Sequence, residues 1–427
     1  MVAILSAFIR RTGLSGFALV LAFSFAAFFA GGANADAPAP IRVGFSLGLT
    51  GGNAPNGKQL LQALELWRDD VNAKGGLLGR PVELVYYDDQ TMPPNDPGIY
   101  TKLIEVDKVD LLLGPYGTNQ IAAALPVIAD HQMTTVGMLG TGANRNLHYG
   151  NYFSMVPLGP DPIHAFSSGF FEIAQAHEPA VKTIAILGVD AEFGKNATDG
   201  ARDNAKAAGL TIVYDQLYPP PTADFTPVLR AVQATNPDIV FVASYPPDTV
   251  GIVHAAREIG LKTKIFGGTM IGLLATPLKA QLGPLMNGIL FHEDFVPAFN
   301  FPGSRDLLKR YQAAAQAQGG MDPLGYGFVP FGYAAGQVLA QAVEATQSLD
   351  QAKLSAYMHG HAFSTVVGSV AFGSDGEWVK ARYVFSQWQH LTGNDLGQIQ
   401  DPKHDVVVWP AAFKTGHLLF PYTAALK

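Results

Sequence analysis

Asn72-Ala-Lys-Gly-Gly-Leu-Leu-Gly-Arg-Pro81 separates a helical pattern from a strand-like one, and this stretch decides the fold prediction. Before it, apolar residues recur on one face of a helix between Leu60 and Val71. After it, Val-Glu-Leu-Val-Tyr-Tyr at 82–87 is typical of a strand. The glycine-dense centre predicts a tight hairpin, so the segment indicates a helix-to-strand return near the start of an α/β lobe.

Strand-like and helix-like runs alternate along the chain in two series. In the first series we expect strands at 41–47, 82–87, 109–113 and 134–138 and helices over 60–71 and 118–129. In the second series we expect strands at 183–187, 210–214, 238–243 and 264–267 and helices over 196–208, 226–235 and 249–259. Such alternation predicts mostly parallel sheets flanked by helices. The turn Pro157-Leu-Gly-Pro160 separates the two series, which indicates two lobes.

The length of 427 residues also favours two lobes, because one hydrophobic core stops growing at about 250–300 residues. Helical patterns at 304–318 and 332–347 follow the second series, so we expect segment 288–298 to cross back to lobe 1. A third crossing is expected between Val366 and Glu377. The predicted boundaries are 36–157 plus 296–370 for lobe 1, and 158–295 plus 371–427 for lobe 2 and a C-terminal segment.

Residues 1–35 have the pattern of a secretory signal peptide. Arg10-Arg11 precedes an apolar run from Leu14 to Ala30, and Ala33-Asn-Ala35 is a small-residue cleavage site. An uncleaved membrane anchor needs about 20 apolar residues, and this run is shorter. We therefore expect a chain that is exported to the periplasm and begins near Asp36.

Composition excludes several classes of function. Lys and Arg number 28 against 35 Asp and Glu, so there is no basic excess that would favour nucleic acid as a partner. The chain has no cysteine, which excludes disulfides, zinc-thiolate sites, thiol catalysis and a lipid-modified cysteine. The motifs of a nucleophile elbow, a phosphate-binding loop and a zinc protease are also missing from the sequence. An enzyme is therefore not expected.

Several motifs resemble, in the same order, those of the leucine/isoleucine/valine-binding family of periplasmic solute receptors. They are the 72–81 stretch, Leu113-Gly-Pro115 before a helix start, Asp224-Phe-Thr226, Asn236-Pro-Asp238, Ala255-Ala-Arg257 with Gly260-Leu261, and Gly332-Tyr-Ala334. The resemblance covers nearly the whole chain after the signal segment. It implies a type I periplasmic-binding-protein clamshell in which two lobes, joined by three crossings, hold a ligand between them.

The resemblance also implies a function and partners. It implies the receptor of an ABC importer of the branched-chain amino-acid class, a monomer that docks on permease subunits in the inner membrane and needs no cofactor. The same clamshell serves in ligand-sensing receptors and regulators, which is the alternative. The cleft is expected beyond the carboxyl ends of the strands, where helix N-termini converge.

Thr118 is the first candidate ligand residue. It opens an apolar helix, so its hydroxyl can cap the helix while the free N–H groups of the first turn attract an anion. From the residues alone a plain helix cap is the favoured explanation of Thr118. The resemblance implies that this loop binds a carboxylate, with Tyr116 and Asn119 on either side of Thr118.

Three further lobe 1 candidates come from the resemblance. Gly140 and Thr141 lie where the family has a second ligand loop, with a backbone carbonyl and a hydroxyl facing the cleft. Asn56, expected in the loop after the first strand, matches a position at the cleft mouth, although an Asn-Gly turn explains it as well.

Lobe 2 supplies Phe193, Tyr245 and Thr269 by the same resemblance. Phe193 stands where the family has Tyr, and Thr269 stands where relatives that bind α-amino acids have Glu. A ligand ammonium without that counter-charge would cost several kcal/mol in a closed cleft. The sequence thus favours a small aromatic or aliphatic carboxylate over an α-amino acid, unless Glu192 or Asp248 supplies the charge. A true branched-chain amino-acid receptor remains the other alternative.

Overall fold

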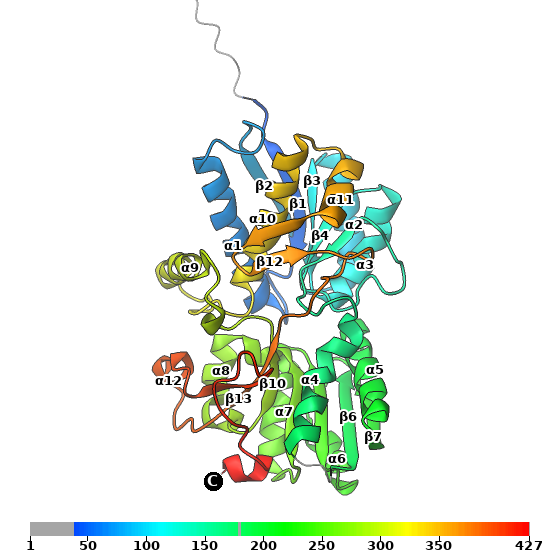
Figure 1. Cartoon of the computed structure of the whole chain (residues 1–427), viewed down its shortest axis with the longest axis vertical. Coiled ribbons are helices and arrows are strands. Elements are labelled where there is room, and N and C mark those ends of the chain that lie inside the picture. Colours follow the sequence, from blue (N-terminus) through cyan, green and yellow to red (C-terminus); the bar gives the residue numbers. More distant parts are fainter. Residues whose placement is uncertain (1–37, 178–180, 427) are drawn as a thin grey trace, which may run out of the picture. The chain divides into compact units, whose positions relative to one another are not determined.

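The computed structural model describes residues 38–177 and 181–426. The predicted signal peptide at 1–35 lies outside the described residues. Within the compact unit Pro38–Lys427, strands and helices form two layered α/β lobes, each built on its own sheet (Figure 1). The predicted α/β class with mostly parallel sheets flanked by helices is therefore confirmed.

Lobe 1 has a five-stranded, fully parallel sheet in the order β2-β1-β3-β4-β5. Its strands are β1 (Ile41–Leu47), β2 (Val82–Asp88), β3 (Leu111–Tyr116), β4 (Thr135–Met138) and β5 (Tyr152–Ser154). Its helices are α1 (Ala54–Ala73), α2 (Asp96–Thr101), α3 (Thr118–Asp130) and, from later in the chain, α10 (Val329–Thr346) and α11 (Gln351–Gly360). Helix α10 packs along α1, which places a late segment beside the first helix (Figure 1).

Lobe 2 has a seven-stranded sheet in the order β14-β13-β10-β9-β8-β6-β7. Its strands are β6 (Thr183–Val189), β7 (Thr211–Tyr218), β8 (Ile239–Ser244), β9 (Ile265–Met270), β10 (Leu290–Glu293), β13 (Val384–Trp388) and β14 (Asp405–Trp409). Its helices are α4 (Pro162–His177), α5 (Glu192–Ala207), α6 (Thr226–Ala234), α7 (Pro246–Glu258), α8 (Thr276–Leu282) and α12 (Leu396–Gln400). Strands β13 and β14 are antiparallel additions from the C-terminal part of the chain.

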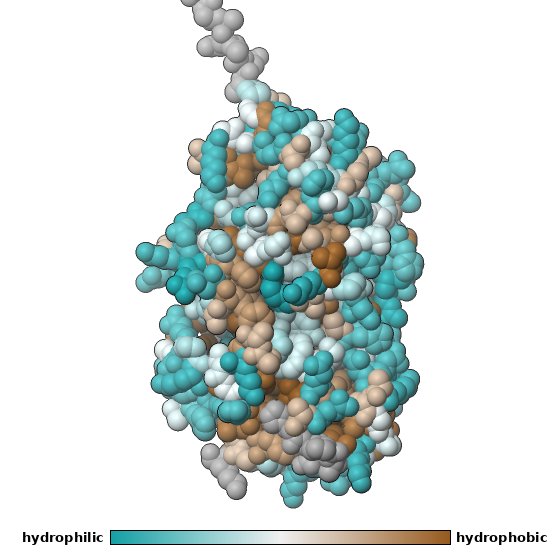
Figure 2. All heavy atoms as spheres, viewed as in Figure 1, coloured by the Kyte–Doolittle hydropathy of each residue, from teal (hydrophilic) through white to brown (hydrophobic). Residues whose placement is uncertain are grey.

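Smaller elements complete the described chain. They are the helix α9 (Ser304–Gln318), the hairpin β11 (Ala362–Thr365) and β12 (Gly368–Ala371), and the short helices η1 (Pro93–Asn95), η2 (Lys102–Val106), η3 (Ile271–Leu274), η4 (Gly283–Met286), η5 (Pro297–Phe299) and η6 (Tyr422–Leu426). The face drawn in Figure 2 is covered mostly by hydrophilic residues, with hydrophobic residues in small groups. Among the described helices, none has the length and apolar character that a membrane span requires.

The stretch at 72–81 folds as the sequence predicts. Leu77 and Arg80 exchange two backbone hydrogen bonds of 2.8 and 2.9 Å, which close the hairpin. Gly76 has a φ of 81°, and a Cβ there would lie 1.9 Å from the Arg80 carbonyl oxygen, so only glycine fits. The Asn72 side chain donates to the Val82 carbonyl at 2.9 Å and accepts from the Val82 N–H at 2.7 Å, which joins the end of α1 to the start of β2.

Three helices begin earlier than their apolar patterns suggest. Helix α1 starts at Ala54 rather than near Leu60, α7 at Pro246 rather than Thr249, and α5 at Glu192 rather than Asn196. Pro55 and Pro246 explain two of these differences, because proline is favoured in the first turn of a helix although it carries no periodic signal. Asn56 consequently lies in the first turn of α1 instead of in a loop. The lobe boundaries and the number of crossings remain predictions.

Candidate functional site

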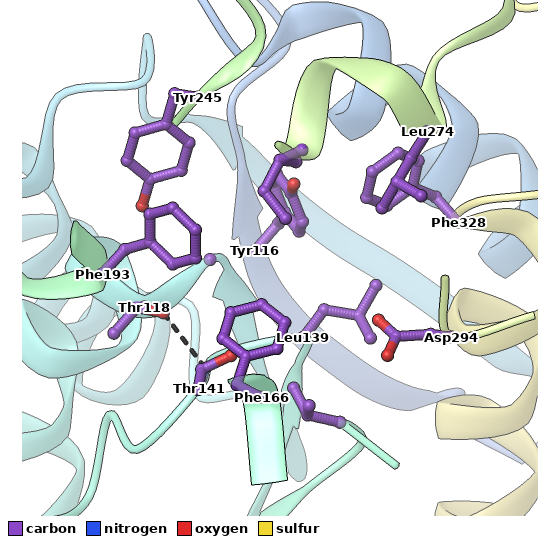
Figure 3. Close-up of a pocket in the computed structure, with 13 residues that line it drawn as sticks. Tyr116, Thr118, Leu139, Thr141, Phe166, Phe193, Tyr245, Leu274, Asp294 and Phe328 are labelled. Carbon is purple, nitrogen blue, oxygen red and sulfur yellow. Dashed lines mark hydrogen bonds between the residues drawn. The ribbon is translucent and has the colours of Figure 1, made fainter. Parts of the chain in front are cut away.

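A pocket between the two lobes gathers side chains from the carboxyl ends of strands and the starts of helices (Figure 3). Lobe 1 contributes the end of β3, the start of α3, the loop after β4 and the residue before α10. Lobe 2 contributes α4, α5, η3 and the residues that follow β8 and β10. The lining residues are Tyr116, Gly117, Thr118, Leu139, Thr141, Val156, Phe166, Phe193, Tyr245, Ile271, Leu274, Asp294 and Phe328.

Thr118 and Thr141 form the polar corner of lobe 1. The Thr118 Oγ1 accepts a hydrogen bond of 3.0 Å from the Thr141 N–H, so the start of α3 and the loop after β4 are tied together (Figure 3). Because Oγ1 is the acceptor in that bond, the Thr118 hydroxyl proton is free to donate. The N–H groups in the first turn of α3 have no acceptor within the helix, as at every helix start.

Tyr116 is held from behind by Asn56. The Asn56 Nδ2 donates to the Tyr116 hydroxyl at 2.9 Å, and both residues are buried. The ring of Tyr116 also meets Phe328 edge-on, with 5.4 Å between centroids. Burial raises the pKa of the Tyr116 phenol, which stays a protonated donor. Asn56 does not line the pocket, and it acts on the site by orienting Tyr116.

The lobe 2 wall is aromatic. The ring of Phe193 lies 4.9 Å from that of Tyr245 and 5.9 Å from that of Phe166, measured between centroids. Burial raises the pKa of the Tyr245 phenol, and its oxygen has no hydrogen-bond partner of good geometry among the described residues. Tyr245 thus offers a donor beside two apolar rings.

Asn119 and Asn196 connect the lobes directly. The Asn119 Oδ1 accepts from the Phe193 N–H at 3.0 Å, and so occupies a free donor in the first turn of α5. From the other side, the Asn196 Nδ2 donates to the Thr141 carbonyl at 3.0 Å and the Asn196 Oδ1 accepts from Arg145 at 2.8 Å. Asn119 does not line the pocket, so the structure gives it a contact between lobes.

Gly140 and Thr269 also lie outside the pocket lining. A Cβ on Gly140 would lie 2.5 Å from the Ile121 Cδ1, so this glycine lets the loop after β4 approach α3 closely. Thr269 is fully buried within β9, and its Oγ1 has no partner among the described residues. The wall beyond β9 is formed by Ile271 and Leu274 of η3, which are apolar.

The sequence predicted only the lining residues Tyr116, Thr118, Thr141, Phe193 and Tyr245, and Asp294 is the charged residue among those that it missed. It directly follows β10, and its Oδ1 accepts a hydrogen bond of 2.7 Å from the His292 Nε2. The His292 side chain is only 1% exposed and that of Asp294 12% exposed. An acid immediately after a buried strand, in a segment expected to join the lobes, was the available signal.

Neither acid proposed from the sequence lines the pocket. Asp248 accepts a hydrogen bond of 3.1 Å from the Tyr218 hydroxyl, and Glu192 accepts one of 3.4 Å from Asn146. Asp294 is the only charged residue of the lining. No group of three or more His, Asp or Glu residues in the described part of the chain could hold a metal ion.

The space enclosed by these side chains is narrow. Its volume is about 30 Å³, which suits roughly one or two water molecules. A cavity that holds benzene measures about 150 Å³ on a comparable scale. An organic ligand therefore requires the lobes or the aromatic rings to move apart.

Comparisons with known proteins agree with this architecture. A family described as periplasmic binding protein matches residues 40–394. A Leu/Ile/Val-binding protein homolog of Brucella suis is 24% identical over 393 residues, covering 92% of this chain and 100% of the relative.

Two solved structures share the fold. A solute-binding protein of an R. palustris ABC transporter, in complex with benzoate, has a TM-score of 0.72 and 20% identity over 87% of this chain and 96% of its own. The branched-chain amino acid transporter substrate-binding protein LivJ of Streptococcus pneumoniae, in complex with isoleucine, has a TM-score of 0.70 and 20% identity over 87% and 100%. The clamshell fold predicted from the motifs is confirmed. The chain therefore belongs to the periplasmic binding protein family, as a relative of the leucine/isoleucine/valine-binding proteins, and is a solute-binding protein rather than an enzyme.

Proposed function

We propose that the protein is the periplasmic substrate-binding component of an ABC importer and that it captures a small carboxylate with an apolar, preferably aromatic, body. The observation that carries the proposal is the pocket between the lobes, which combines neutral donors in lobe 1 with aromatic walls in lobe 2. Export through the segment 1–35 and docking on inner-membrane permeases are parts of the same proposal.

The donors suit a carboxylate. The Thr118 hydroxyl, the first-turn N–H groups of α3 and the Tyr116 and Tyr245 phenols all belong to residues at or beside the lining. A helix start attracts an anion, and each hydrogen bond to a charged group contributes about 1.5–3 kcal/mol. Two or three such bonds amount to a large part of the roughly 8 kcal/mol that a micromolar affinity requires.

The walls suit a flat apolar body better than an α-amino group. Phe166, Phe193 and Phe328 are each no more than 3% exposed and face the pocket. The position where an ammonium partner was sought, Thr269, is buried inside β9, and η3 presents Ile271 instead. A ligand ammonium placed against Ile271 would lose its hydration without gaining a counter-charge from η3, and the one carboxylate of the lining, that of Asp294, belongs to the segment after β10.

Capture would proceed by hinge closure. The narrow space admits a ligand only when the lobes separate, and the bound ligand then stabilises the closed form in proportion to its preference for that form. The benzoate bound to the R. palustris relative and the isoleucine bound to LivJ mark the two ligand classes to be compared.

A thermal-shift screen of the chain from Asp36 onward tests the proposal. We expect benzoate, hydroxybenzoates or cinnamate to raise the melting temperature, because a ligand at a hundredfold its Kd stabilises a protein by about 2.7 kcal/mol. Short fatty acids, leucine and isoleucine complete the screen. Stabilisation by leucine or isoleucine and by none of the simple acids would contradict the ligand preference and make the protein an amino-acid receptor.

A further inference from the structure

Asp294 introduces a negative charge into a pocket that otherwise holds only neutral side chains. It belongs to the segment that leaves β10, and it lines the pocket together with Leu139 and Phe166. A carboxylate on the ligand would be repelled by this group unless the two lie apart. Figure 3 shows Asp294 on the opposite side of the pocket from Thr118 and Thr141.

The Asp294 carboxylate is oriented by the buried His292 side chain. His292 donates from Nε2 to the Asp294 Oδ1 at 2.7 Å. The imidazole is fixed between the ring of Tyr383, stacked at 4.8 Å, and the ring of Phe166, edge-on at 4.7 Å. The Nδ1 of His292 has no partner among the described residues, so the bond to Asp294 is the one hydrogen bond of this imidazole there.

One acceptor on Asp294 remains for a ligand. Within residues 38–177 and 181–426, His292 is the only side chain that donates a hydrogen bond to Asp294. A carboxylate has about four lone-pair sites, so one bond leaves most of its capacity unused. A ligand that covers Asp294 without supplying a donor removes its water and replaces it with nothing, which lowers affinity.

We infer that Asp294 is a specificity-determining residue that accepts a hydrogen bond from a hydroxyl group at the end of the ligand remote from its carboxylate. The preferred substrate class is then an aromatic carboxylic acid that carries a distal hydroxyl. This inference rests on the proposed function, because it assumes that the ligand carboxylate lies at Thr118. A branched-chain α-amino acid carries both of its polar groups on the same carbon and cannot supply a donor to Asp294 while its carboxylate lies at Thr118.

Isothermal titration with four matched acids tests the inference: benzoate, 2-hydroxybenzoate, 3-hydroxybenzoate and 4-hydroxybenzoate. A hydrogen bond to a charged group corresponds to roughly tenfold or more in affinity. We therefore expect the 3-hydroxy or 4-hydroxy acid to bind at least tenfold more tightly than benzoate. The 2-hydroxy acid should show no such gain, because its hydroxyl lies beside its own carboxylate.

Two variants of Asp294 and one control assign the effect to this residue. In Asp294→Ala the ratio of affinities for the distal hydroxy acid and benzoate should fall to threefold or less. Asp294→Asn keeps the shape of the side chain and removes its charge, so its ratio of affinities should be intermediate. This variant tests the inference even if the alanine variant folds poorly. Glu258→Gln removes an exposed acid that does not line the pocket and should keep the wild-type ratio.

Each result decides a specific point. Equal binding of benzoate and all hydroxybenzoates overturns the role of Asp294 and leaves the proposed function standing. A distal preference that persists in Asp294→Ala also overturns it, because another group then reads the hydroxyl. Binding of none of the four acids by the folded protein overturns the ligand preference and the inference together.

Discussion

The Thr118 side chain both supports the fold of lobe 1 and can bind a ligand. Its oxygen accepts the Thr141 N–H at 3.0 Å, and its proton is free for a ligand. We expect Thr118→Val to weaken carboxylate binding tenfold or more, since it removes that donor. The same change leaves the buried Thr141 N–H without an acceptor, which costs about 1–3 kcal/mol of stability. From the sequence alone an unchanged melting temperature would be expected, and the Thr141 contact is the reason that it should fall.

Thr118→Ser is the matched control, because it keeps the hydroxyl and loses only a methyl group. Titration calorimetry with the acid selected by the screen, together with urea unfolding, separates the two effects. Wild-type affinity in Thr118→Val would show that the ligand carboxylate does not lie at this corner.

Residues at strand ends were predictable to different degrees. Thr118, Thr141 and Tyr245 follow buried apolar runs, so their position at the carboxyl edge of a sheet can be inferred from the sequence, and all three line the pocket. Thr269 does not line the pocket, because β9 continues to Met270 instead of ending at Gly267, and the lining residue beyond the strand is Ile271. The sequence indicates that Asp294 follows a buried strand, but its place in the pocket depends on how the two lobes meet, which no local pattern encodes.

The first turns of α5 contact lobe 1, and Asn196 makes two of these contacts. The Asn196 Nδ2 donates to the Thr141 carbonyl at 3.0 Å. Asn196→Asp keeps the acceptor for Arg145 and removes this donor. One hydrogen bond contributes about 1 kcal/mol, so we expect ligand affinity to fall about fivefold, because the closed form is destabilised relative to the open one. Small-angle scattering of the ligand-free variant should show a larger radius of gyration.

Asn204→Asp provides the control on the same helix. Its Nδ2 donates to the His164 carbonyl and the Ser167 hydroxyl, both at 2.8 Å and both within lobe 2. That variant should lose stability while ligand affinity stays within twofold of the wild type. An equal loss of affinity in both variants would mean that Asn196 acts through the stability of lobe 2 and not through closure.

Helix starts show the limit of periodicity at the element scale. The apolar pattern of α5 begins at Asn196, whereas the helix begins at Glu192, because its first turn faces the other lobe and carries mixed side chains. The motif at 72–81, in contrast, was readable because glycine and asparagine report backbone geometry directly. A turn whose geometry is set by its own residues can thus be predicted from the sequence. The start of a helix that depends on contacts with the other lobe cannot.

Buried carboxyl groups influence the stability of the whole molecule. Burial raises the pKa of Asp96 to about 8. It also raises the pKa values of Glu293 and Glu377 to about 8. Asp96 is fully buried, and its Oδ1 accepts from the Ser46 hydroxyl at 2.6 Å. Between pH 4 and 8 the folded state therefore keeps protons that the unfolded state, with an ordinary aspartate pKa near 3.9, has lost.

The sign of the effect follows from proton linkage. Stability falls with rising pH wherever the folded state binds more protons than the unfolded state, by up to about 1.4 kcal/mol per pH unit for each group. We expect the free energy of unfolding of the wild type to decrease from pH 5 to pH 8. Asp96→Asn replaces the protonated carboxyl by a neutral amide of the same shape, so its decrease should be smaller.

Urea unfolding at pH 5, 6, 7 and 8 measures these slopes. His131 and His164, whose pKa values are raised by hydrogen bonds to carbonyl and carboxylate groups, contribute a slope of the same sign in both proteins, so the difference isolates Asp96. Glu258→Gln, at an exposed position, should keep the wild-type slope. If the free energy of unfolding falls equally with pH in Asp96→Asn and in the wild type, then Asp96 is ionised in the folded protein as it is in the unfolded one. The common slope then comes from other titratable groups.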